Sequence, residues 1–371
     1  MNKKKKVVIV GSSIAGAAAA FLLAKNFDVV VYEQKKRNEI GKKLCANICT
    51  DLFGEIIKSY GLDKRRFIKT YYGHVMFQSE NNWARLPTKE YEINRQKFID
   101  ALILKARKRG AKFVFSEKLK DVDENEKITL IFTKGKKKIR EEADIVIGAD
   151  GASSKVAEQT GLAKKRKFFL AILASLNRKE VRNFDVKKGE NRVFVGKRFG
   201  HYAYISSSEK SIKVGLMDDF KKDVVGEFRK FLLFLGVKDA KKIKVHGALI
   251  PKPSVLKTKK RVFLIGDAGG YQKFSEGGII PALLSAEALK DILFEGNYSK
   301  RRKLKRRTSL NKLAVLFFSF MNDKNWDELI EVMKDEKYTS LVAKRDWFGK
   351  EDFMLLLSPK IVKFALRALF T

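Results

Sequence analysis

The chain has 371 residues, of which 45% are hydrophobic, so it can bury a large core, and general disorder is excluded. Its 79 basic and 43 acidic residues give a net charge of +36, which implies attraction to anionic surfaces such as nucleic acid, acidic lipid or an acidic substrate. Because Lys is spread along the whole chain, a general compositional bias explains the charge equally well.

Cysteine and histidine usage excludes two further classes of protein. Cys45 and Cys49 are too few for a disulfide framework, and they favour a reducing cytoplasm. Neither cysteine has partners at zinc-ligand spacing and the three histidines lie far apart, so no metal site is expected. Met1–Lys6 resembles the start of a secretion signal, but Val7–Val10 leads into glycine rather than into an apolar segment. The chain has no run of about 18 uncharged apolar residues, so no transmembrane helix is expected.

The first 33 residues predict a βαβ unit. Val7–Val10 is a β-branched run, typical of a strand that is buried on both faces. The alanine-rich segment Ile14–Lys25 predicts a helix, and Phe27–Tyr32 predicts the next strand, which ends at Glu33.

The turn inside this unit fits a dinucleotide-binding fingerprint, with Ser13 where the second glycine usually lies. Gly11 allows the tight turn, and Gly16 lets the helix pack closely on the strand. The N–H groups at the start of the helix would meet a pyrophosphate through residues such as Ala15. Glu33, 22 residues after Gly11, would accept hydrogen bonds from ribose hydroxyls. The structural alternative is a tight turn beside an exposed glutamate.

The middle of the chain predicts a helix over Asn94–Arg109 and then strands at Ala111–Phe115, Ile128–Phe132 and Ile145–Ile147. The last strand runs into a second Gly/Asp turn, Gly148–Gly151.

From about 165 to 250 the pattern changes to that of an antiparallel sheet. The expected strands are Phe168–Ser175, Asn191–Val195, His201–Ile205 and Ile212–Leu216. A helix is expected over Asp223–Leu235.

The third Gly/Asp turn follows another buried-type strand, Arg261–Ile265. Asp267 can accept a hydrogen bond from a ribitol hydroxyl, which an NAD domain would not explain. Gly277 and Gly278 open a helix at Ile279, whose positive end would face the flavin ring and stabilise negative charge there. The three strand-to-glycine turns together predict FAD as the cofactor. A capped, flexible loop is the alternative for the third turn.

Beyond residue 297 a basic stretch, Lys300–Arg307, precedes several predicted helices. Leu313–Met321 is apolar but too short to span a membrane. Phe353–Leu357 and Ile361–Phe370 belong to the same region and, in the second case, mix apolar with basic positions. These segments would either lie in a membrane interface or cover the substrate domain.

These motifs resemble the para-hydroxybenzoate-hydroxylase-like FAD superfamily and, within it, the geranylgeranyl reductase family, which includes archaeal digeranylgeranylglycerophospholipid reductases. The resemblance covers roughly residues 5–295. Lys43–Ile48 is similar to the family's Lys-x-Cys-Gly-Gly-Gly loop, and Ile93–Phe98 to its Arg-bearing segment. Tyr202–Ser207, with Gly215, falls where the family has Tyr-x-Trp-x-Phe-Pro and a later glycine.

Several positions depart from the family pattern. Ala46 and Asn47 replace glycines, and Tyr204 replaces the tryptophan. Ala157 stands where an arginine is usual after the second turn. Because the Tyr-x-Trp-x-Phe-Pro segment contacts substrate in the family, these departures affect the substrate half of the site most.

The resemblance implies an enzyme, an FAD-dependent oxidoreductase that reduces C=C bonds of isoprenoid chains. Cys45 would lie near the flavin and help proton delivery, unless it is simply a small buried residue. Arg95 suits a pyrophosphate contact, with a solvated charge at a helix start as the alternative. Tyr202 and Tyr204 would contact the substrate. The expected FAD contacts are Gly11, Ser13, Ala15, Gly16, Glu33, Cys45, Ala46, Ile48, Arg95, Leu119, Asp267, Gly277, Gly278 and Ile279.

The predicted fold class is α/β, with a discontinuous Rossmann-like FAD-binding domain over 1–165 and 250–297. An antiparallel-sheet substrate domain over 166–249 and a helical C-terminal region over 298–371 complete the chain. An apolar tunnel is expected on the substrate sheet, with Phe168, Phe169, Phe194, Tyr202 and Tyr204 as candidate lining residues.

The expected partners are an isoprenoid lipid, an anionic membrane surface and an electron donor such as NAD(P)H or ferredoxin. The expected location is cytoplasmic, peripheral on the cytoplasmic membrane face. No nucleic acid is expected, since no RNA-binding module is recognised. The alternatives are an aromatic hydroxylase or quinone-linked dehydrogenase of the same superfamily, an RNA-associated flavoprotein and a non-catalytic flavin binder.

Overall fold

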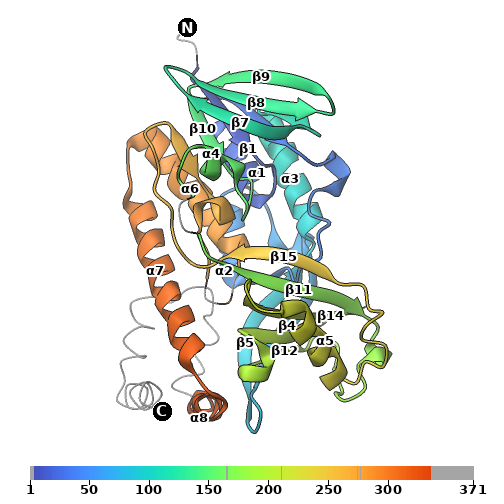
Figure 1. Ribbon diagram of the computed structural model, residues 1–371. Helices are drawn as coiled ribbons and strands as arrows, with labels where there is room; N and C mark the ends of the chain where they lie inside the picture. The colour runs from blue at the N-terminus through green and yellow to red at the C-terminus, as the bar shows by residue number, and fades with distance from the viewer. Residues whose placement is uncertain (1–3, 164–165, 210, 274, 276, 336–371) are drawn as a thin grey trace.

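A computed structural model describes residues 4–163, 166–209, 211–273, 275 and 277–335. Within these residues the chain forms three β-sheets, here named A, B and C, with α-helices packed around them. Sheet C lies at one end of the molecule and sheet B at the other, with sheet A and its helices beside sheet C (Figure 1).

Sheet A is parallel, and its strands come from the start, the middle and the late part of the chain. Its order is β16-β10-β1-β2-β6. The strands are β1 (Lys6–Val10), β2 (Asp28–Glu33), β6 (Lys112–Phe115), β10 (Ile145–Gly148) and β16 (Val262–Leu264). The predicted α/β fold with a discontinuous Rossmann-like sheet is confirmed.

The two faces of sheet A bury alternate residues of the same strands, as the period of a strand requires. Val7 and Ile9 pack against a layer of helices, whereas Val8 and Val10 pack against sheet C. The helical layer holds α1 (Ile14–Leu23), α2 (Asp51–Lys58), α3 (Arg95–Lys108) and α6 (Ile279–Glu295). Sheet C is antiparallel and contains β7 (Lys118–Glu124), β8 (Ile128–Lys134) and β9 (Lys137–Ala143), beside the short helix α4 (Lys155–Gln159).

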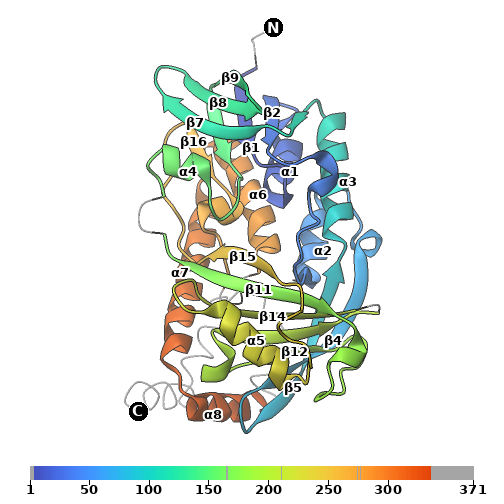
Figure 2. The same ribbon diagram turned by 45° about the vertical axis from the view of Figure 1, so that its right-hand side comes forward.

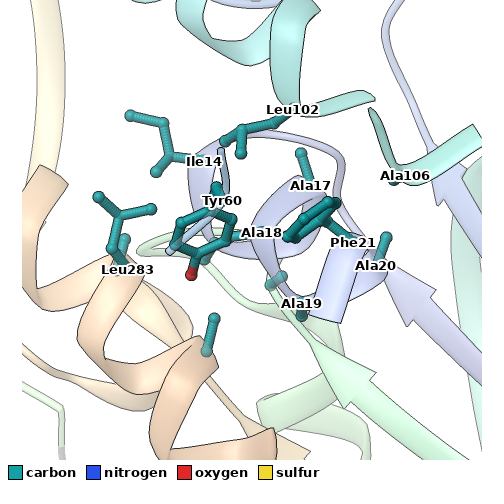
Figure 3. Close-up of a cluster of buried hydrophobic side chains, with 14 of the residues drawn as sticks. Ile14, Ala17, Ala18, Ala19, Ala20, Phe21, Tyr60, Leu102, Ala106 and Leu283 are labelled. Carbon is teal, nitrogen blue, oxygen red and sulfur yellow. The ribbon is translucent and has the colours of Figure 1, made fainter. Parts of the chain in front are cut away.

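Helix α1 owes its central position to four consecutive alanines, Ala17–Ala20, all of which are fully buried. Alanine has the highest helix propensity, and its small side chain lets several elements approach one helix closely. Around α1 pack Leu102 and Ala106 of α3, Leu283 of α6 and the ring of Tyr60 (Figure 3). Figure 3 also shows that these neighbours come from segments far apart in the sequence.

Sheet B has the strand order β15-β11-β14-β13-β12-β4-β5-β3. The strands expected between 165 and 250 are present, but sheet B also contains three strands from residues 48–93. The predicted antiparallel sheet is therefore mixed, because β12 pairs parallel with β4. The domain limits drawn in the sequence analysis stay a prediction. The strands are β3 (Ile48–Thr50), β4 (Ile68–Gln78), β5 (Trp83–Ile93), β11 (Phe168–Leu176), β12 (Asn191–Phe194), β13 (Tyr202–Ser207), β14 (Ile212–Asp219) and β15 (His246–Pro251).

The two faces of sheet B also differ. Helix α5 (Val224–Phe234) covers the outer face, where Phe194 is fully buried against Phe199 and Phe231. Figure 2 shows α5 lying across the strands of this sheet. Phe194 was therefore wrongly expected in the tunnel, because its neighbours Val193 and Val195 point to the opposite face.

Two further helices run from α6 to the far end of sheet B. Helix α7 (Ser299–Phe320) extends along the side of the molecule, and α8 (Asp323–Met333) packs on β5 (Figures 1 and 2). Asp327 of α8 accepts hydrogen bonds from Ser79 Oγ at 2.5 Å and from Asn81 Nδ2 at 3.0 Å, which fixes α8 to the β4–β5 turn. Within the described helices, none combines the length and the apolar character that a membrane span needs. The segments 353–357 and 361–370 lie outside the described residues.

The buried hydroxyl of Tyr60 gives a prediction about stability. Tyr60 is 1% exposed, and its hydroxyl has no hydrogen-bond partner among the described residues. Burial raises the pKa of Tyr60 well above its ordinary value, so the group is neutral. Tyr60→Phe removes an unsatisfied polar group, and we expect it to raise the free energy of unfolding by about 1 kcal/mol in urea denaturation.

Tyr72→Phe is the matched control. Tyr72 is equally buried, but its hydroxyl lies 2.8 Å from Ser206 Oγ. Its removal leaves Ser206 unpaired, so we expect a loss of about 1 kcal/mol. Equal effects of the two substitutions would contradict the assignment of Tyr60 as unsatisfied.

Candidate functional site

A cavity of about 730 Å³ lies where sheet A, sheet B and helices α6, α7 and α8 meet. Its walls include the start of α1, the loop over residues 43–47, the inner face of sheet B and the start of α6. One cavity thus brings together all three Gly/Asp turns, which are separated by more than 100 residues along the chain.

The first turn has no room for side chains at its two glycines. Gly11 has a φ of +97°, and a Cβ there would lie 2.4 Å from the carbonyl O of Ala149 in the second turn. A Cβ at Gly16 would lie 1.8 Å from the carbonyl O of Gly11. The glycines therefore let β1, α1 and the second turn approach each other, while Ser13 and Ala15 form the cavity wall.

Glu33 supports the turn from the end of β2. One carboxylate oxygen accepts hydrogen bonds from the N–H of Ser12 at 2.9 Å and from Ser12 Oγ at 3.0 Å. The other accepts from the N–H of Lys35 at 3.0 Å. Glu33 is 8% exposed and does not border the cavity, although a carboxylate has lone pairs for further donors.

The N-termini of α1 and α6 both point into the cavity, which makes this wall favourable for negative charge. Ser13, Ile14 and Ala15 mark the first N-terminus, and Gly278 and Ile279 mark the second. The side chains of Lys43 and Arg95 add two positive charges to the same wall. Burial lowers the pKa of Lys43, with Lys35 and Arg95 acting in the same direction.

Arg95 also shapes the loop beside it. Its guanidinium donates to the carbonyl O of Gly41 at 3.2 Å and to the carbonyl O of Lys43. Arg95 comes directly after Asn94, whose side chain caps α3 by accepting from the N–H of Lys97 at 3.0 Å. The arginine is therefore fixed by a helix start and holds the loop that leads to Cys45.

Asp267 is the acidic residue of the third turn, and it lies at the cavity wall. Burial raises the pKa of Asp267 to about 6, while Arg166, Lys43 and Arg95 oppose this rise. Its Oδ1 accepts from Gln272 Nε2 at 2.6 Å, and a Cβ at Gly278 would lie 3.1 Å from the same oxygen. Gly278 thus keeps the start of α6 close to the carboxylate.

Two residues at this wall were missed by sequence reasoning. Arg166 donates to the carbonyl O of Ala152 at 2.8 Å and to that of Asp267 at 2.6 Å, so it joins the second turn to the third. Gln272 borders the cavity, and its buried Oε1 has no hydrogen-bond partner among the described residues. Neither residue belongs to a recognisable motif, so only the fold could identify them.

Cys45 lies in the loop before β3, is partly exposed and borders the cavity. Cys49 is in β3 and is 2% exposed. Neither cysteine forms a disulfide among the described residues, and the two do not share a helix. Among the described residues no cluster of His, Cys, Asp and Glu could hold a metal ion.

Tyr202 and Tyr204 lie on the inner face of sheet B and border the cavity. Tyr202 Oη donates to the carbonyl O of Ser275 at 3.0 Å. Burial raises the pKa of Tyr204 well above its ordinary value. The ring of Tyr204 lies over Gly215 on β14, where a Cβ would come within 2.3 Å of it, so Gly215 makes the space for this ring.

The cavity continues from these tyrosines into an apolar arm between sheet B and helices α7 and α8. The arm is formed by aliphatic and aromatic side chains: Leu173, Val193, Met217, Leu310, Ala314, Phe317, Phe318, Trp326, Leu329 and Ile330. Phe168 and Phe169, which were expected in such a tunnel, do not border the cavity.

The structure thus brings most of the expected site residues to one cavity. Those that border it are Ser13, Ala15, Cys45, Ala46, Ile48, Arg95, Tyr202, Tyr204, Asp267, Gly277, Gly278 and Ile279. Gly11, Gly16 and Glu33 lie behind the wall and shape it. Leu119 is 5% exposed and packs in the core between sheets A and C. The contacts of these residues with FAD stay predictions.

The wall fits an anionic dinucleotide on three observations. The glycine turn places the start of α1, from Ser13 to Ala15, at the cavity wall, where the first N–H groups of a helix suit a pyrophosphate. Two helix N-termini and two cationic side chains face the same space. Gln272 offers a buried acceptor, Oε1, that no group in the described part of the chain binds.

Comparison with known proteins agrees with this fit. The family described as FAD binding domain matches residues 4–215. No curated protein matches the chain significantly in sequence.

Solved structures show the same fold. A geranylgeranyl bacteriochlorophyll reductase-like protein from Thermoplasma acidophilum has a TM-score of 0.79 and 18% identity, covering 98% of each chain. The p-nitrophenol 4-monooxygenase PnpA from Pseudomonas putida has a TM-score of 0.70 and 16% identity, covering 92% of this chain and 97% of that one. A variant of the halogenase PltM in complex with FAD has a TM-score of 0.65 and 15% identity, covering 98% of this chain and 86% of that one.

Asp267 gives a prediction about pH. Its pKa is higher in the folded chain, about 6, than its ordinary value of 3.8, so the folded state holds the proton more tightly. The tighter binding of this proton stabilises the folded state by on the order of 3 kcal/mol. This stabilisation is complete below pH 3.8 and is lost as the pH rises through 6. Urea denaturation of the flavin-free protein and of Asp267→Asn at several pH values should show this loss in the parent only. Parallel curves for the two proteins between pH 4 and 7 would contradict the prediction.

Proposed function

Because the chain belongs to the family with this FAD binding domain, and is an FAD-dependent oxidoreductase, we propose that it reduces carbon–carbon double bonds of isoprenoid chains. The family shows the cofactor and the class of enzyme. The relative from Thermoplasma acidophilum, described as geranylgeranyl bacteriochlorophyll reductase-like, supports the narrower proposal through its fold. The loop around Cys45 supports it separately, because this loop resembles that of the geranylgeranyl reductase family.

The observation that carries the proposal is the shape of the cavity. Its volume of about 730 Å³ is within the usual range for small-molecule sites. One end has the glycine turns and cationic side chains that suit a dinucleotide, and the other end is an apolar arm. A prenyl chain has no polar groups to satisfy, so an arm lined by side chains such as Phe317 and Trp326 suits it better than it suits a polar substrate.

Reduction of a C=C bond consumes two electrons and two protons, and bound, reduced FAD supplies the electrons. The apolar arm would orient the chain and exclude water from the reacting carbons. Cys45 lies at the junction of the two ends, where its thiol can deliver a proton. Tyr204 is neutral because burial raises its pKa, so it can line the arm without placing a charge there.

Helix α7 supports a second part of the proposal, attachment to an anionic membrane. Four cationic side chains of its first turns are exposed, namely Arg302, Lys303, Lys305 and Arg306. Further along the same helix Leu313, Leu316 and Phe320 are 59%, 53% and 60% exposed and share one face. An amphipathic surface of this kind suits an acidic lipid surface, from which a prenyl lipid would enter the arm. NAD(P)H or ferredoxin would supply the electrons to FAD.

The reaction is tested anaerobically. The purified protein is loaded with FAD, reduced with dithionite and mixed with prenyl lipids, while flavin absorbance and product mass are followed. We expect flavin reoxidation with a product heavier by two hydrogens per double bond. Oxygen-dependent NAD(P)H consumption with a phenolic substrate, and no prenyl product, would instead support a hydroxylase and overturn the proposal.

Cys45→Ser tests the proton source in the same assay. We expect reoxidation by prenyl lipid to slow by about 100-fold, the usual effect of losing a positioned general acid. Cys49→Ser is the matched control, because Cys49 is nearby but 2% exposed in β3. We expect it to keep nearly the parental rate, and equal losses in the two variants would show that Cys45 has no special role.

Membrane attachment is tested by sedimentation with vesicles. We expect binding to vesicles that contain acidic lipid at low salt, loss of binding at high salt, and little binding to neutral vesicles. Changing Arg302, Lys303, Lys305 and Arg306 to Gln should abolish binding. The matched control changes the exposed Lys134, Lys136, Lys137 and Lys138 to Gln, which alters the net charge equally but in the β8–β9 turn of sheet C rather than on α7. If both variants bind equally well, α7 is not the attachment surface.

A further inference from the structure

The inner face of sheet B carries buried polar side chains behind the loop of Cys45, and the proposed reaction does not use them. Lys213, Ser206 and Asn191 lie opposite one another on β14, β13 and β12, so they form one row across the sheet. All three are less than 10% exposed, as are Glu90 and Glu92 of β5. Such a row in the interior is costly unless its members bind one another.

Two members of the row bind the buried glutamates of β5. Lys213 Nζ lies 2.6 Å from Glu92 Oε1, and their side chains are 11% and 3% exposed. Asn191 Nδ2 donates to Glu90 Oε2 at 3.1 Å. Lys69 Nζ also faces Glu92 Oε1 at 3.9 Å, from a half-exposed position, and Glu92 Oε2 has no partner among the described residues. Lys213 is therefore the principal partner of the buried Glu92.

The same ammonium group reaches beyond the sheet. Lys213 Nζ donates to the carbonyl O of Ala46 at 3.2 Å, although the two residues are 167 positions apart. Ala46 directly follows Cys45, so this hydrogen bond joins the ammonium group to the residue next to the thiol. Lys213 is thus attached to the segment that borders the cavity.

The rest of the loop is fixed in a similar way by its carbonyl groups. Arg95 binds the carbonyl O of Gly41 and of Lys43, and the N–H of Ile93 donates to the carbonyl O of Asn47 at 3.0 Å. Asn47 has a φ of +57°, a left-handed conformation that a non-glycine residue adopts at a cost. The fold holds this conformation from outside the loop, and Lys213 contributes by binding the carbonyl O of Ala46, the residue between Cys45 and Asn47.

We propose that Lys213 is a positioning residue, which through its ion pair with Glu92 holds the Ala46 carbonyl and so fixes the Cys45 thiol at the cavity wall. The functional importance of the Cys45 thiol's position rests on the proposed function, because the thiol matters only if it faces the reacting atoms. Where Lys213 holds the thiol does not depend on which substrate the protein takes. A buried ion pair often adds little to stability, so a role in orienting a loop accounts for its presence better than stability does.

The test measures the reactivity of Cys45 by iodoacetamide alkylation, read separately for each cysteine by mass spectrometry. Lys213→Met alone leaves Glu92 buried without its main partner and is open to misfolding. The informative variant is the double substitution Lys213→Met with Glu92→Leu, which removes both charges and keeps apolar volume. We expect this variant to fold, by circular dichroism, and to alkylate Cys45 about fivefold faster than the parent, with weaker FAD binding by fluorescence titration.

Cys49 is the internal control, because general loosening of the fold would raise its alkylation as well. Lys222→Met is the matched control variant, since Lys222 pairs with Asp218 at 2.9 Å at the exposed end of the same region and touches no loop carbonyl. We expect Cys45 of the Lys222→Met variant to be alkylated at the parental rate. A folded double variant in which Cys45 alkylates at the parental rate overturns the proposal. None of these measurements uses a prenyl lipid, so failure of prenyl reduction leaves their result unaffected.

Discussion

The close approach of the first glycine turn to the second is the constraint on which the rest of the site depends. A single methyl group at Gly11 would meet the Ala149 carbonyl, and one at Gly16 would meet the Gly11 carbonyl. Because neither glycine has a side chain, β1, β10 and α1 lie close together, and the alanines of α1 pack against α3 and α6. That packing in turn brings the N-termini of α1 and α6 to one cavity, where their dipoles act together.

Charge inside the protein is arranged in two separate groups. Lys43, Arg95 and Arg166 surround Asp267 at the dinucleotide end, where their charges partly offset the effect of burial on its pKa. Lys213 and Glu92 pair on the inner face of sheet B, behind the loop of Cys45. Between the two groups the loop over residues 41–47 is held by donors from both sides. The apolar arm begins beyond this loop, and Glu90 and Asn191 of sheet B also border the cavity.

Local patterns predicted much of this arrangement. The strands and helices around the three glycine turns lie within a few residues of their expected limits. Each turn contains a positive φ that glycine adopts readily and other residues avoid, so the glycines mark where the strands end. The predictions were weaker for which face of sheet B an aromatic side chain occupies. Phe194, Tyr202 and Tyr204 were all expected at the cavity, but only the two tyrosines border it, whereas Phe194 is buried in the core on the outer face. Twenty-eight phenylalanines give no signal for choosing between two apolar faces. The strands of residues 68–93 were not expected in sheet B, since their pairing with β12 is parallel and distant in sequence.

The sequence by itself determined the dinucleotide fold, the cofactor and the residues of each turn, because glycine, acid and strand spacing are local properties of the chain. Only the tertiary structure decided which distant residues complete the site. Arg166 joins two turns, Gln272 binds Asp267, and Lys213 reaches Ala46 across 167 positions. No motif marks these residues, since a lysine, an arginine or a glutamine acquires such a role from the surfaces that folding brings against it, and burial is what makes each of their hydrogen bonds obligatory.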